Sequence, residues 1–371
     1  MLALDWAKAF DCISPDALIQ ALGRFGIPEK LLIVIRSIYN NRKFYVSDAG
    51  VTSQAHDQHY GICQGCPLSP FLFGMLMTVL ITDAKRNLQQ SGVQLNTETL
   101  VDELLYADDT LLVDVDSAVV EAYMHEVSKA GAVYGLTFNW DKLETLPINC
   151  SCNIADANGK LLKQKERIVH LGNMLSADGT SSSELNRRIG AARDTFSKLC
   201  RIWGHTSIPN ERKLEIYSAC VLTKLTYNLH ALLLNTAEER KLDAFHVRCL
   251  RQILHIPHSY IARVSNSSVL AQASTKNLSK LLLHRQLNLM CNLALRSDSD
   301  ILRQSIFKPG GFELNLPVGP KKRGRPRKLW AQVMFEHAVR ATGSQERLAQ
   351  LWQPAPAAKA AWSACLRCYC K

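Results

Sequence analysis

The chain has 371 residues, 47% of them hydrophobic and 21% charged, so it can bury a sizeable core and is long enough for two or three domains. Its longest apolar stretch, about residues 71–82, is too short to cross a bilayer, and no secretory signal opens the sequence, so we expect a nuclear or cytoplasmic protein rather than a membrane or secreted one. The net charge of +11 is unevenly divided, because residues 1–150 hold 10 Lys/Arg against 18 Asp/Glu whereas residues 151–371 hold 34 against 15. An acidic first part suits a cation site, and a basic second part suits a polyanion.

The first 150 residues are predicted to alternate strands and helices. Residues 2–5 are typical of the end of a buried strand, and Ser14 before Pro15 predicts the start of a helix. Further elements are expected as helices at 29–39, 71–87 and 118–134, a hairpin joining 43–47 to 54–60, and strands near 136–138 and 144–148.

Two adjacent carboxylates, Asp108 and Asp109, stand between the apolar runs 104–105 and 110–113. The flanks are short, aliphatic and free of proline, so they predict a tight turn between two buried strands. Carboxylates in apolar surroundings need a cation or hydrogen-bond donors, and rigidly held hard oxygen ligands suit Mg²⁺. Asp also favours exposed turns for backbone reasons, so a solvated acidic turn is the alternative.

After another expected hairpin at 160–175, the pattern changes to long helices. Ser181 and Glu184 have the spacing of a capping box, and apolar residues then recur at spacings of three and four while Arg187 and Arg188 lie on the opposite, basic face. Similar helices are predicted at 210–234, 237–254 and 269–295, and a Gly/Pro-rich linker follows at 309–320. The fold class is therefore α+β followed by an all-α region.

Asp5 ends an apolar strand about a hundred residues before Asp108. A lone Asp at a strand end is usually a cap or turn residue, but paired in space with Asp108 it could complete a two-Mg²⁺ site for phosphoryl transfer. Between these acids, the segment 60–73 contains Gly and Pro residues that allow close backbone approach and fix the entry into the next helix. Its Cys63-x-x-Cys66 spacing lacks a second ligand pair nearby, so zinc is disfavoured.

Three segments together resemble motifs A, B and C of reverse transcriptases, most closely those of non-LTR (LINE-type) retrotransposons. They are Asp5-x-x-Lys8-Ala9-Phe10-Asp11, Gln64-Gly65-Cys66-Pro67-Leu68-Ser69-Pro70 and Tyr106-Ala107-Asp108-Asp109. Residues 139–142 resemble motif D, residues 170–172 resemble motif E, and residues 181–256 resemble the thumb and post-polymerase region. The resemblance implies a right-hand polymerase: a palm at 1–178, a helical thumb region at 179–305, and a basic linker and tail at 306–371.

The resemblance also implies a role for each matching residue. Asp5 and Asp108 would chelate two Mg²⁺ ions, or Mn²⁺, with Asp109 supporting them. Gln64 and Gly65 would line the nucleotide pocket, and Phe10 would exclude a ribose 2′-hydroxyl. Lys142 would protonate the departing pyrophosphate as a general acid. The implied reaction adds deoxynucleotides to a DNA 3′-end on an RNA template. From the residues alone, core packing for Phe10 and a solvated turn for Lys142 are the simpler interpretations.

The motifs begin at the start of the chain, without the fingers that precede the palm in this family. We therefore expect a truncated element, whose activity alone is an open question. A catalytically inactive remnant that only binds nucleic acid is the alternative function. A group II intron-type maturase is a third hypothesis, which fits less well after motif E.

A basic segment in the tail resembles an AT-hook, an extended Gly-Arg-Pro core flanked by cations that contacts a DNA minor groove and phosphates. Its basic residues are Lys321, Lys322, Arg323, Arg325, Arg327 and Lys328. A solvated linker and a nuclear localisation signal are the alternatives, and we favour nucleic-acid contact. The final Cys365-x-x-Cys368-x-Cys370 could begin a zinc knuckle, but nothing completes it, so an irregular end with free thiols is expected.

Overall fold

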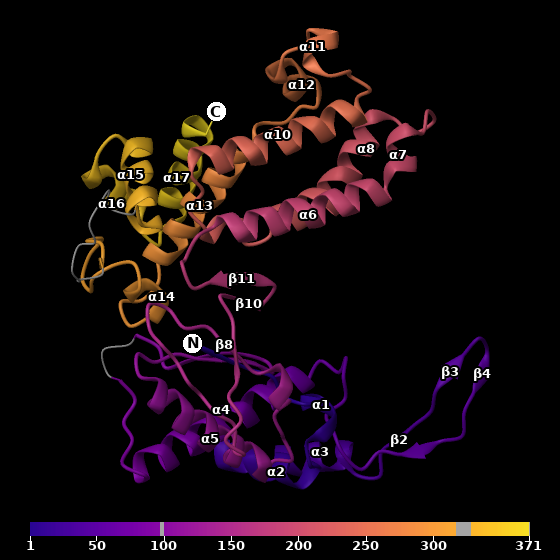
Figure 1. Cartoon of the computed structure of the whole chain (residues 1–371), viewed down its shortest axis with the longest axis vertical. Helices are drawn as coiled ribbons and strands as arrows, with labels where there is room; N and C mark the ends of the chain where they lie inside the picture. Colours follow the sequence, from indigo (N-terminus) through magenta and orange to yellow (C-terminus); the bar gives the residue numbers. More distant parts are fainter. Residues whose placement is uncertain (97–99, 317–327, 371) are drawn as a thin grey trace. The chain divides into compact units, whose positions relative to one another are not determined.

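A computed structural model describes residues 1–96, 100–316 and 328–370. The chain divides into two compact units, Met1–Gly179 and Thr180–Lys371 (Figure 1). The first combines a sheet with helices and the second is helical, so the chain has the mixed α and β content that the sequence predicts.

The first unit is built on a five-stranded sheet with the order β6–β7–β1–β8–β9. Neighbouring strands are antiparallel except for the parallel pair β8–β9. The strands are β1 Leu2–Leu4, β6 Glu103–Tyr106, β7 Asp109–Leu112, β8 Glu144–Thr145 and β9 Lys163–Gln164. The sheet thus brings residues 2–4 and 109–112, far apart in sequence, onto adjacent strands.

Helices cover one face of this sheet. Because side chains alternate along a strand, Leu2, Leu4 and Leu112 point into the main core. That core is completed by helices α2 Pro15–Phe25, α3 Glu29–Tyr39, α4 Ser69–Gln90 and α5 Ser117–Val133 (Figure 1). On the other face, Ala3 and Leu111 join a small cluster with Ile168.

Two further hairpins belong to this unit. The predicted hairpin at 43–60 forms two successive ladders, β2 Lys43–Phe44 with β5 His56–Asp57, and β3 Ser47–Asp48 with β4 Val51–Thr52. The second hairpin pairs β10 Arg167–His170 with β11 Asn173–Ser176. Both confirm the expected strand–turn–strand segments, and the first extends as an arm from its unit in Figure 1.

The second unit contains two hydrophobic cores. The first is formed by α6 Ser182–Lys198, α7 Cys200–Gly204, α8 Asn210–Ile216, the π-helix η2 Tyr217–Leu222, α9 Thr223–Thr226, α10 Thr236–Ile253, α12 Asn266–Gln272 and the start of α13 Leu278–Ala294. The second packs the rest of α13 against α15 Trp330–Thr342, α16 Gln345–Leu351 and α17 Pro356–Tyr369. Short helices at Ser259–Ala262 (α11) and Ile301–Gln304 (α14) complete the unit.

The helix predictions were wrong in three places. The single helix expected over 210–234 is broken by η2 and ends at Thr226, and the one expected over 269–295 is interrupted between α12 and α13. Ser181 does precede α6, but its hydroxyl bonds Leu233 O and Glu238 instead of capping the helix. A capping box instead joins Asn235 and Glu238 at the start of α10.

The expected irregular C-terminal end was also wrong. Residues 356–369 form helix α17, because Trp362 and Leu366 give the segment an apolar face that is buried in the second core. The three cysteines near the end are free thiols, and Cys370 is buried. Among the described residues, no helix is both long and apolar enough to span a bilayer.

Candidate active site

The acidic pair lies on the turn of the β6–β7 hairpin. Tyr106 pairs with Asp109, which leaves Ala107 and Asp108 as a two-residue turn, and Ala107 adopts a φ of 52°. A turn with positive φ matches the twist of the flanking strands. The sequence therefore predicted strand–turn–strand correctly and the burial of its first strand incorrectly: Leu104, Leu105 and Tyr106 are 44%, 40% and 66% exposed, because β6 is at the end of the sheet in the described part of the chain.

The sheet register brings Asp5 to the acidic hairpin. Leu4 pairs with Thr110 in the antiparallel β1–β7 ladder, so the next residues, Asp5 and Asp109, follow at the same end of the two strands. Alternation along each strand places both on the face opposite the main core, because Leu4 and Thr110 occupy the core face. Asp108 adjoins this pair on the turn.

Lys142 also reaches this end of the sheet. It ends the short helix η1 Trp140–Lys142, and its Nζ lies 3.4 Å from Oδ2 of Asp5. The helix is held beside β1, since the N–H of Asn139 donates to the carbonyl oxygen of Asp5 at 2.8 Å. The structure therefore brings together Asp5, Asp109 and Lys142 from three separate segments.

The segment around Gly61 and Gln64 packs on the short helix α1 Ala9–Cys12. The N–H of Ile62 donates to the Phe10 carbonyl at 2.6 Å, and Gln64 Nε2 donates to Oδ1 of Asp11 at 3.2 Å. Gly61 has a φ of +90°, and a Cβ there would lie 2.9 Å from backbone atoms of Asp11 and Phe10. Only glycine fits so close an approach, which joins this segment to the one that carries Asp5.

Phe10 and Gly65 differ in their surroundings. The ring of Phe10 stacks on that of Phe73 in α4, with centroids 4.4 Å apart and an interplanar angle of 17°. Phe10 is partly buried against the main core, so its ring position is fixed by packing. Gly65 has a φ of +87° and open space where a Cβ would point.

A charged network that the sequence did not reveal supports the start of β6. Lys85 of α4 lies 3.2 Å from Asp102 Oδ2 and 2.8 Å from Glu103 Oε2, and Tyr123 of α5 donates to Glu103 at 3.1 Å. Burial and the nearby Glu103 raise the pKa of Tyr123 above its ordinary value. The strand that leads to the acidic turn is thus tied to two core helices. The residues of each pair are at least 17 positions apart in sequence, so no local sequence motif could have revealed the network.

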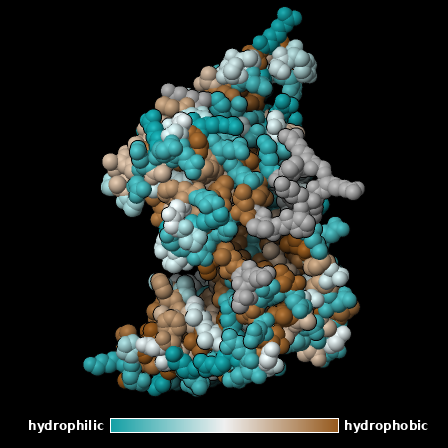
Figure 2. All heavy atoms as spheres, turned by 90° about the vertical axis from the view of Figure 1, so that its left-hand side faces the viewer, coloured by the Kyte–Doolittle hydropathy of each residue, from teal (hydrophilic) through white to brown (hydrophobic). Residues whose placement is uncertain are grey.

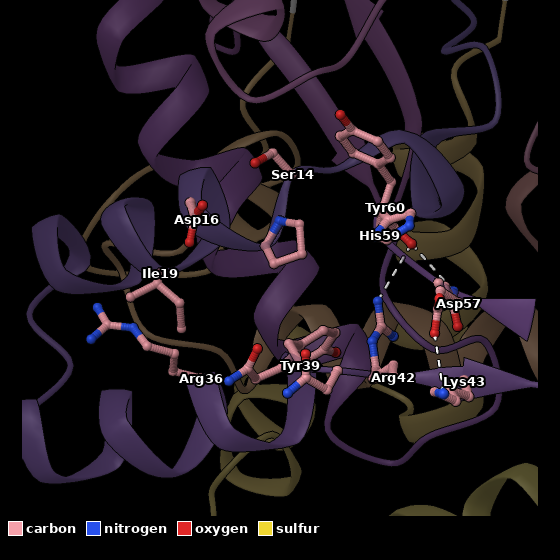
Figure 3. A pocket seen from close by; sticks show the side chains of 14 residues that line it. Ser14, Asp16, Ile19, Arg36, Tyr39, Arg42, Lys43, Asp57, His59 and Tyr60 are labelled. Atoms are coloured by element: carbon pink, nitrogen blue, oxygen red, sulfur yellow. Dashed lines mark hydrogen bonds and ion pairs between the residues drawn. The ribbon is translucent and has the colours of Figure 1, made fainter.

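A cavity of about 1000 Å³ lies beside the Gly61 segment, between the start of α2, the end of α3 and the base of the β2–β5 ladder (Figure 3). Arg36 and Tyr39 from α3, together with Arg42, line it. Arg42 donates to Cys63 Sγ at 3.0 Å, and its guanidinium lies 4.4 Å from the centre of the Tyr39 ring. Arg42 therefore links the cavity wall to the Gly61–Gln64 backbone.

The cation-binding capacity of the acids follows from their chemistry. Three carboxylates at one strand end are hard oxygen donors of the kind that bind Mg²⁺. Across residues 1–96, 100–316 and 328–370, no three His, Cys, Asp or Glu side chains are grouped closely enough to hold an ion. Asp108 and Asp109 are exposed, so their side chains are accessible to a cation from solvent.

The predicted nucleic-acid contacts fall into two groups. Arg187 and Arg188 both bind Glu184, with Arg187 Nε 2.7 Å and Arg188 Nε 2.5 Å from its carboxylate, and Arg188 also lies 4.6 Å from the centre of the Tyr227 ring. Glu184 is buried, so both arginines neutralise it at the start of α6. In the basic tail, Lys328 is exposed, and Lys321, Lys322, Arg323, Arg325 and Arg327 lie outside the described residues.

Comparison with known proteins shows which family the first part of the chain resembles. Residues 1–173 match the family model described as "Reverse transcriptase (RNA-dependent DNA polymerase)". Over these residues the chain is similar to reverse transcriptases, and the relatives described next come from retrotransposable elements.

Similarity extends beyond the reverse transcriptase domain. The chain is 24% identical over 366 residues to the Pol polyprotein of a type-1 R2 retrotransposable element from Popillia japonica, covering 91% of this chain and 48% of that protein. It is 23% identical over 237 residues to the RNA-directed DNA polymerase of the mobile element jockey from Drosophila melanogaster, covering 61% and 25%. The chain thus spans about half or less of the length of these relatives.

Among solved structures, an apo telomerase from Candida tropicalis is similar, with a TM-score of 0.36 and 12% identity over 78% of this chain and 50% of that one. A telomerase from Candida albicans in complex with a fragment of telomeric RNA gives a TM-score of 0.35 and 15% identity, covering 78% and 46%. Because these TM-scores are low, the similarity to reverse transcriptases rests on the sequence match alone.

Proposed function

We propose that this chain provides the catalytic core of an RNA-directed DNA polymerase, which adds deoxynucleotides to a DNA 3′-end on an RNA template. The observation that carries the proposal is the register of β1 and β7, which sets Asp5 beside the acidic turn of a reverse transcriptase domain. The substrates would be deoxynucleoside triphosphates, with an RNA template and a DNA primer as partners.

Asp5 and Asp108 would hold the divalent cations, with Asp109 beside them. The donor type fits, because carboxylate oxygens are the hard ligands that Mg²⁺ prefers, and these acids lie at the same end of two adjacent strands, where a bound cation would have to draw their side chains together. Bound Mg²⁺ would supply Lewis-acid stabilisation of the attacking 3′-oxygen and of the leaving pyrophosphate. The protein's part is to fix the strands that carry these carboxylates, which the β1–β7 ladder and the Lys85 network at the start of β6 support.

Lys142 would donate a proton to the departing pyrophosphate. Its side chain is 65% exposed and its ammonium already lies beside Asp5, so a substrate phosphate at the carboxylate edge would lie within its reach. Phe10 would select against ribose, and Gln64 and Gly65 would line the nucleotide pocket. The fixed Phe10–Phe73 stack and the Gln64–Asp11 hydrogen bond support these roles.

We further propose that the first unit is a polymerase palm and that α6 to α10 form a thumb. The support is the five-stranded sheet carrying the acids, followed by amphipathic helices with their own core. The domain limits at 178 and 305 remain predictions.

Primer extension with a labelled DNA primer, an RNA template, deoxynucleotides and Mg²⁺ tests the proposal. Asp5→Asn and Asp108→Asn should each abolish extension by the full chain. Asp48→Asn, on the exposed hairpin arm, is the matched control and should extend like the unaltered chain. Extension by Asp108→Asn at the control rate would overturn the metal-site assignment.

Direct cation binding gives a readout that does not depend on activity. Mn²⁺ binding, followed by electron paramagnetic resonance, should be lost in an Asp5→Asn/Asp108→Asn variant and kept in Asp48→Asn. If the double variant bound Mn²⁺ as tightly as the control, these carboxylates would not be the ligands. Loss of binding with an unchanged circular dichroism spectrum would support the proposal.

A further inference from the structure

The middle of the second unit is devoid of acidic residues over a long stretch. Residues 244–297 contain no Asp or Glu, but they contain seven Lys or Arg residues. Such a one-sided distribution leaves a positive field that nothing in the same segment cancels. The α11–α12 end of this unit is mostly hydrophilic in Figure 2.

Helix α10, whose second half lies in this stretch, forms one wall of a groove. Two hollows of about 530 and 330 Å³ adjoin along the helix, since Ala244, Val247 and Asn266 line both of them. The other wall comes from the loop after α10 and from the start of α12. We call this feature the α10 groove.

Two arginines on one face of α10 line the groove. Arg240 lines one hollow and Arg248 the other, and at 1.5 Å rise per residue their backbones are about 12 Å apart along the helix. Within the described ranges, neither guanidinium is held in an ion pair or hydrogen bond. Asp243, which also lines the groove, accepts hydrogen bonds from Ser279 N at 2.9 Å and Ser279 Oγ at 2.6 Å. The cations are therefore available and the carboxylate is engaged.

The opposite wall is fixed to the helix by a buried arginine. Arg251 is 7% exposed and donates to Pro257 O at 3.0 Å, to Val264 O at 2.7 Å and to Asn266 Oδ1 at 3.0 Å. The loop after α10 is thus held in one position by charge-assisted hydrogen bonds. A groove preorganised in this way does not need to be ordered when a ligand binds.

An exposed aromatic ring lies next to the larger of the two hollows, beside His258. Tyr260 is 80% exposed, and its ring stacks on His258, which lines the groove, with centroids 5.7 Å apart and an interplanar angle of 6°. The two rings are parallel, and the tyrosine ring stays largely exposed. An exposed aromatic face beside unpaired arginines is the combination that binds an unstacked base together with its phosphates.

We propose that the α10 groove binds single-stranded nucleic acid, with phosphates at Arg240 and Arg248 and a base on Tyr260. This site lies in the second unit and is separate from the carboxylate edge proposed for polymerisation. It uses neither Arg187 nor Arg188, which bind Glu184. Binding at the α10 groove does not require that the chain polymerises.

Fluorescence anisotropy with a labelled 12-nucleotide single strand tests the groove, using the full chain at several salt concentrations. In Arg240→Ala/Arg248→Ala, the dissociation constant should rise about tenfold, and the slope of its logarithm against log salt should fall by about 1.4, the value for two phosphates on a single strand. Tyr260→Ala should weaken binding by roughly tenfold without changing the slope.

Matched variants control for net charge and folding. Arg347→Ala/Arg367→Ala removes two exposed arginines from α16 and α17 and should leave affinity near that of the unaltered chain. Arg240→Lys/Arg248→Lys keeps both charges and should retain the salt slope. A slope for the double alanine variant equal to that of the α16–α17 control would overturn the proposal.

Cross-linking locates the strand independently of affinity. An oligonucleotide with 4-thiouridine should cross-link to peptides within 240–277, and cross-links wholly outside that range would also overturn the proposal. Because RNA and DNA both present phosphates and bases, single strands of both kinds are compared. Affinity for either strand that depends on Tyr260 and on both arginines supports the groove. A duplex that binds as tightly, with the same dependence on Tyr260, would overturn the single-strand assignment. Asp108→Asn should bind normally, so failure at the groove and failure of the polymerase site are distinguishable.

Discussion

The ammonium of Lys142 lies 3.4 Å from the carboxylate of Asp5, although 137 positions separate the two residues in sequence. The contact is made because η1 is hydrogen-bonded to the end of β1. Lys142 is 65% and Asp5 39% exposed, so the pair is solvated and contributes little to stability. We therefore propose a chemical rather than a structural role for Lys142.

Replacing Lys142 should separate these roles. We expect Lys142→Gln to lower the rate of primer extension by about 100-fold, the scale of general acid catalysis, and to leave Tm unchanged. Lys160→Gln is the matched control, because Lys160 forms a similarly exposed pair with Asp141 at 3.2 Å. Single-nucleotide incorporation measured by rapid quench checks the rates, and equal rates for the two variants would contradict the assignment.

Phe10→Val should change sugar selection. Shortening this side chain should raise incorporation of ribonucleotides relative to deoxynucleotides by about tenfold or more, because a contact against the 2′-hydroxyl would be lost. The control is Phe73→Leu, which removes the ring stacked on Phe10 but leaves Phe10 in place. Competition between ribo- and deoxynucleotides in primer extension provides the measurement. A ratio in Phe10→Val no higher than in Phe73→Leu would show that Phe10 only packs in the core.

Gly61→Ala should destabilise the first unit. The added Cβ would lie 2.9 Å from backbone atoms of Asp11 and Phe10 at a φ of +90°, so both a clash and backbone strain oppose it. We expect a loss of about 2 kcal/mol or more in the free energy of unfolding. Gly159→Ala has a φ of +79° but open space around the Cβ, so strain alone should cost about 1 kcal/mol. Urea denaturation of both variants compares them, and equal losses would contradict the proposed clash.

His246 should make the second unit less stable at acidic pH. Burial lowers the pKa of His246 to about 4, and its Nδ1 lies 3.0 Å from the hydroxyl of buried Tyr217. The unfolded chain, with a pKa near 6.5, takes up the proton first as pH falls, so stability is complete above pH 6.5 and is lost between 6.5 and 4. Between pH 7 and 4.5 this group should remove about 2–3 kcal/mol. Denaturation at both pH values should show a smaller loss in His246→Gln, and an identical loss would contradict the prediction.

Local patterns were sufficient to predict much of the first unit. The acidic turn, the hairpins at 43–60 and 167–176, and the helices near 71–87 and 118–134 all depend on short-range periodicity and turn residues, and each is present. What failed was burial of β6, since whether a strand lies inside a sheet or at its end depends on partners far away in sequence. The alignment of Asp5 with Asp109 likewise comes from strand pairing, and the sequence offered only a hypothetical pairing of Asp5 with Asp108.

Long-range partners also explain the errors in the second unit. The Ser181–Glu184 spacing matched a capping box, yet the Ser181 side chain does not cap the helix, and the buried Glu184 binds Arg187 and Arg188. Arg187 and Arg188, which the sequence placed on a basic face of α6, both bind Glu184, and an apolar period does not show which cations neutralise a buried acid. Trp362 and Leu366 give α17 its apolar face, but the prediction for this segment relied on the cysteine spacing and did not use that apolar pattern.

The two sides of the carboxylate edge differ in how firmly they are anchored. Asp5 follows a strand with hydrogen-bonded neighbours on both sides, β7 and β8, whereas Asp108 lies at the tip of a hairpin whose outer strand, in the part of the chain that is described, has one neighbour. Local opening of β6 can therefore occur without breaking the β1–β8 ladder. Backbone amides of β6 should exchange with solvent faster than those of β1, so the acidic turn would leave the site while Asp5 stays in place.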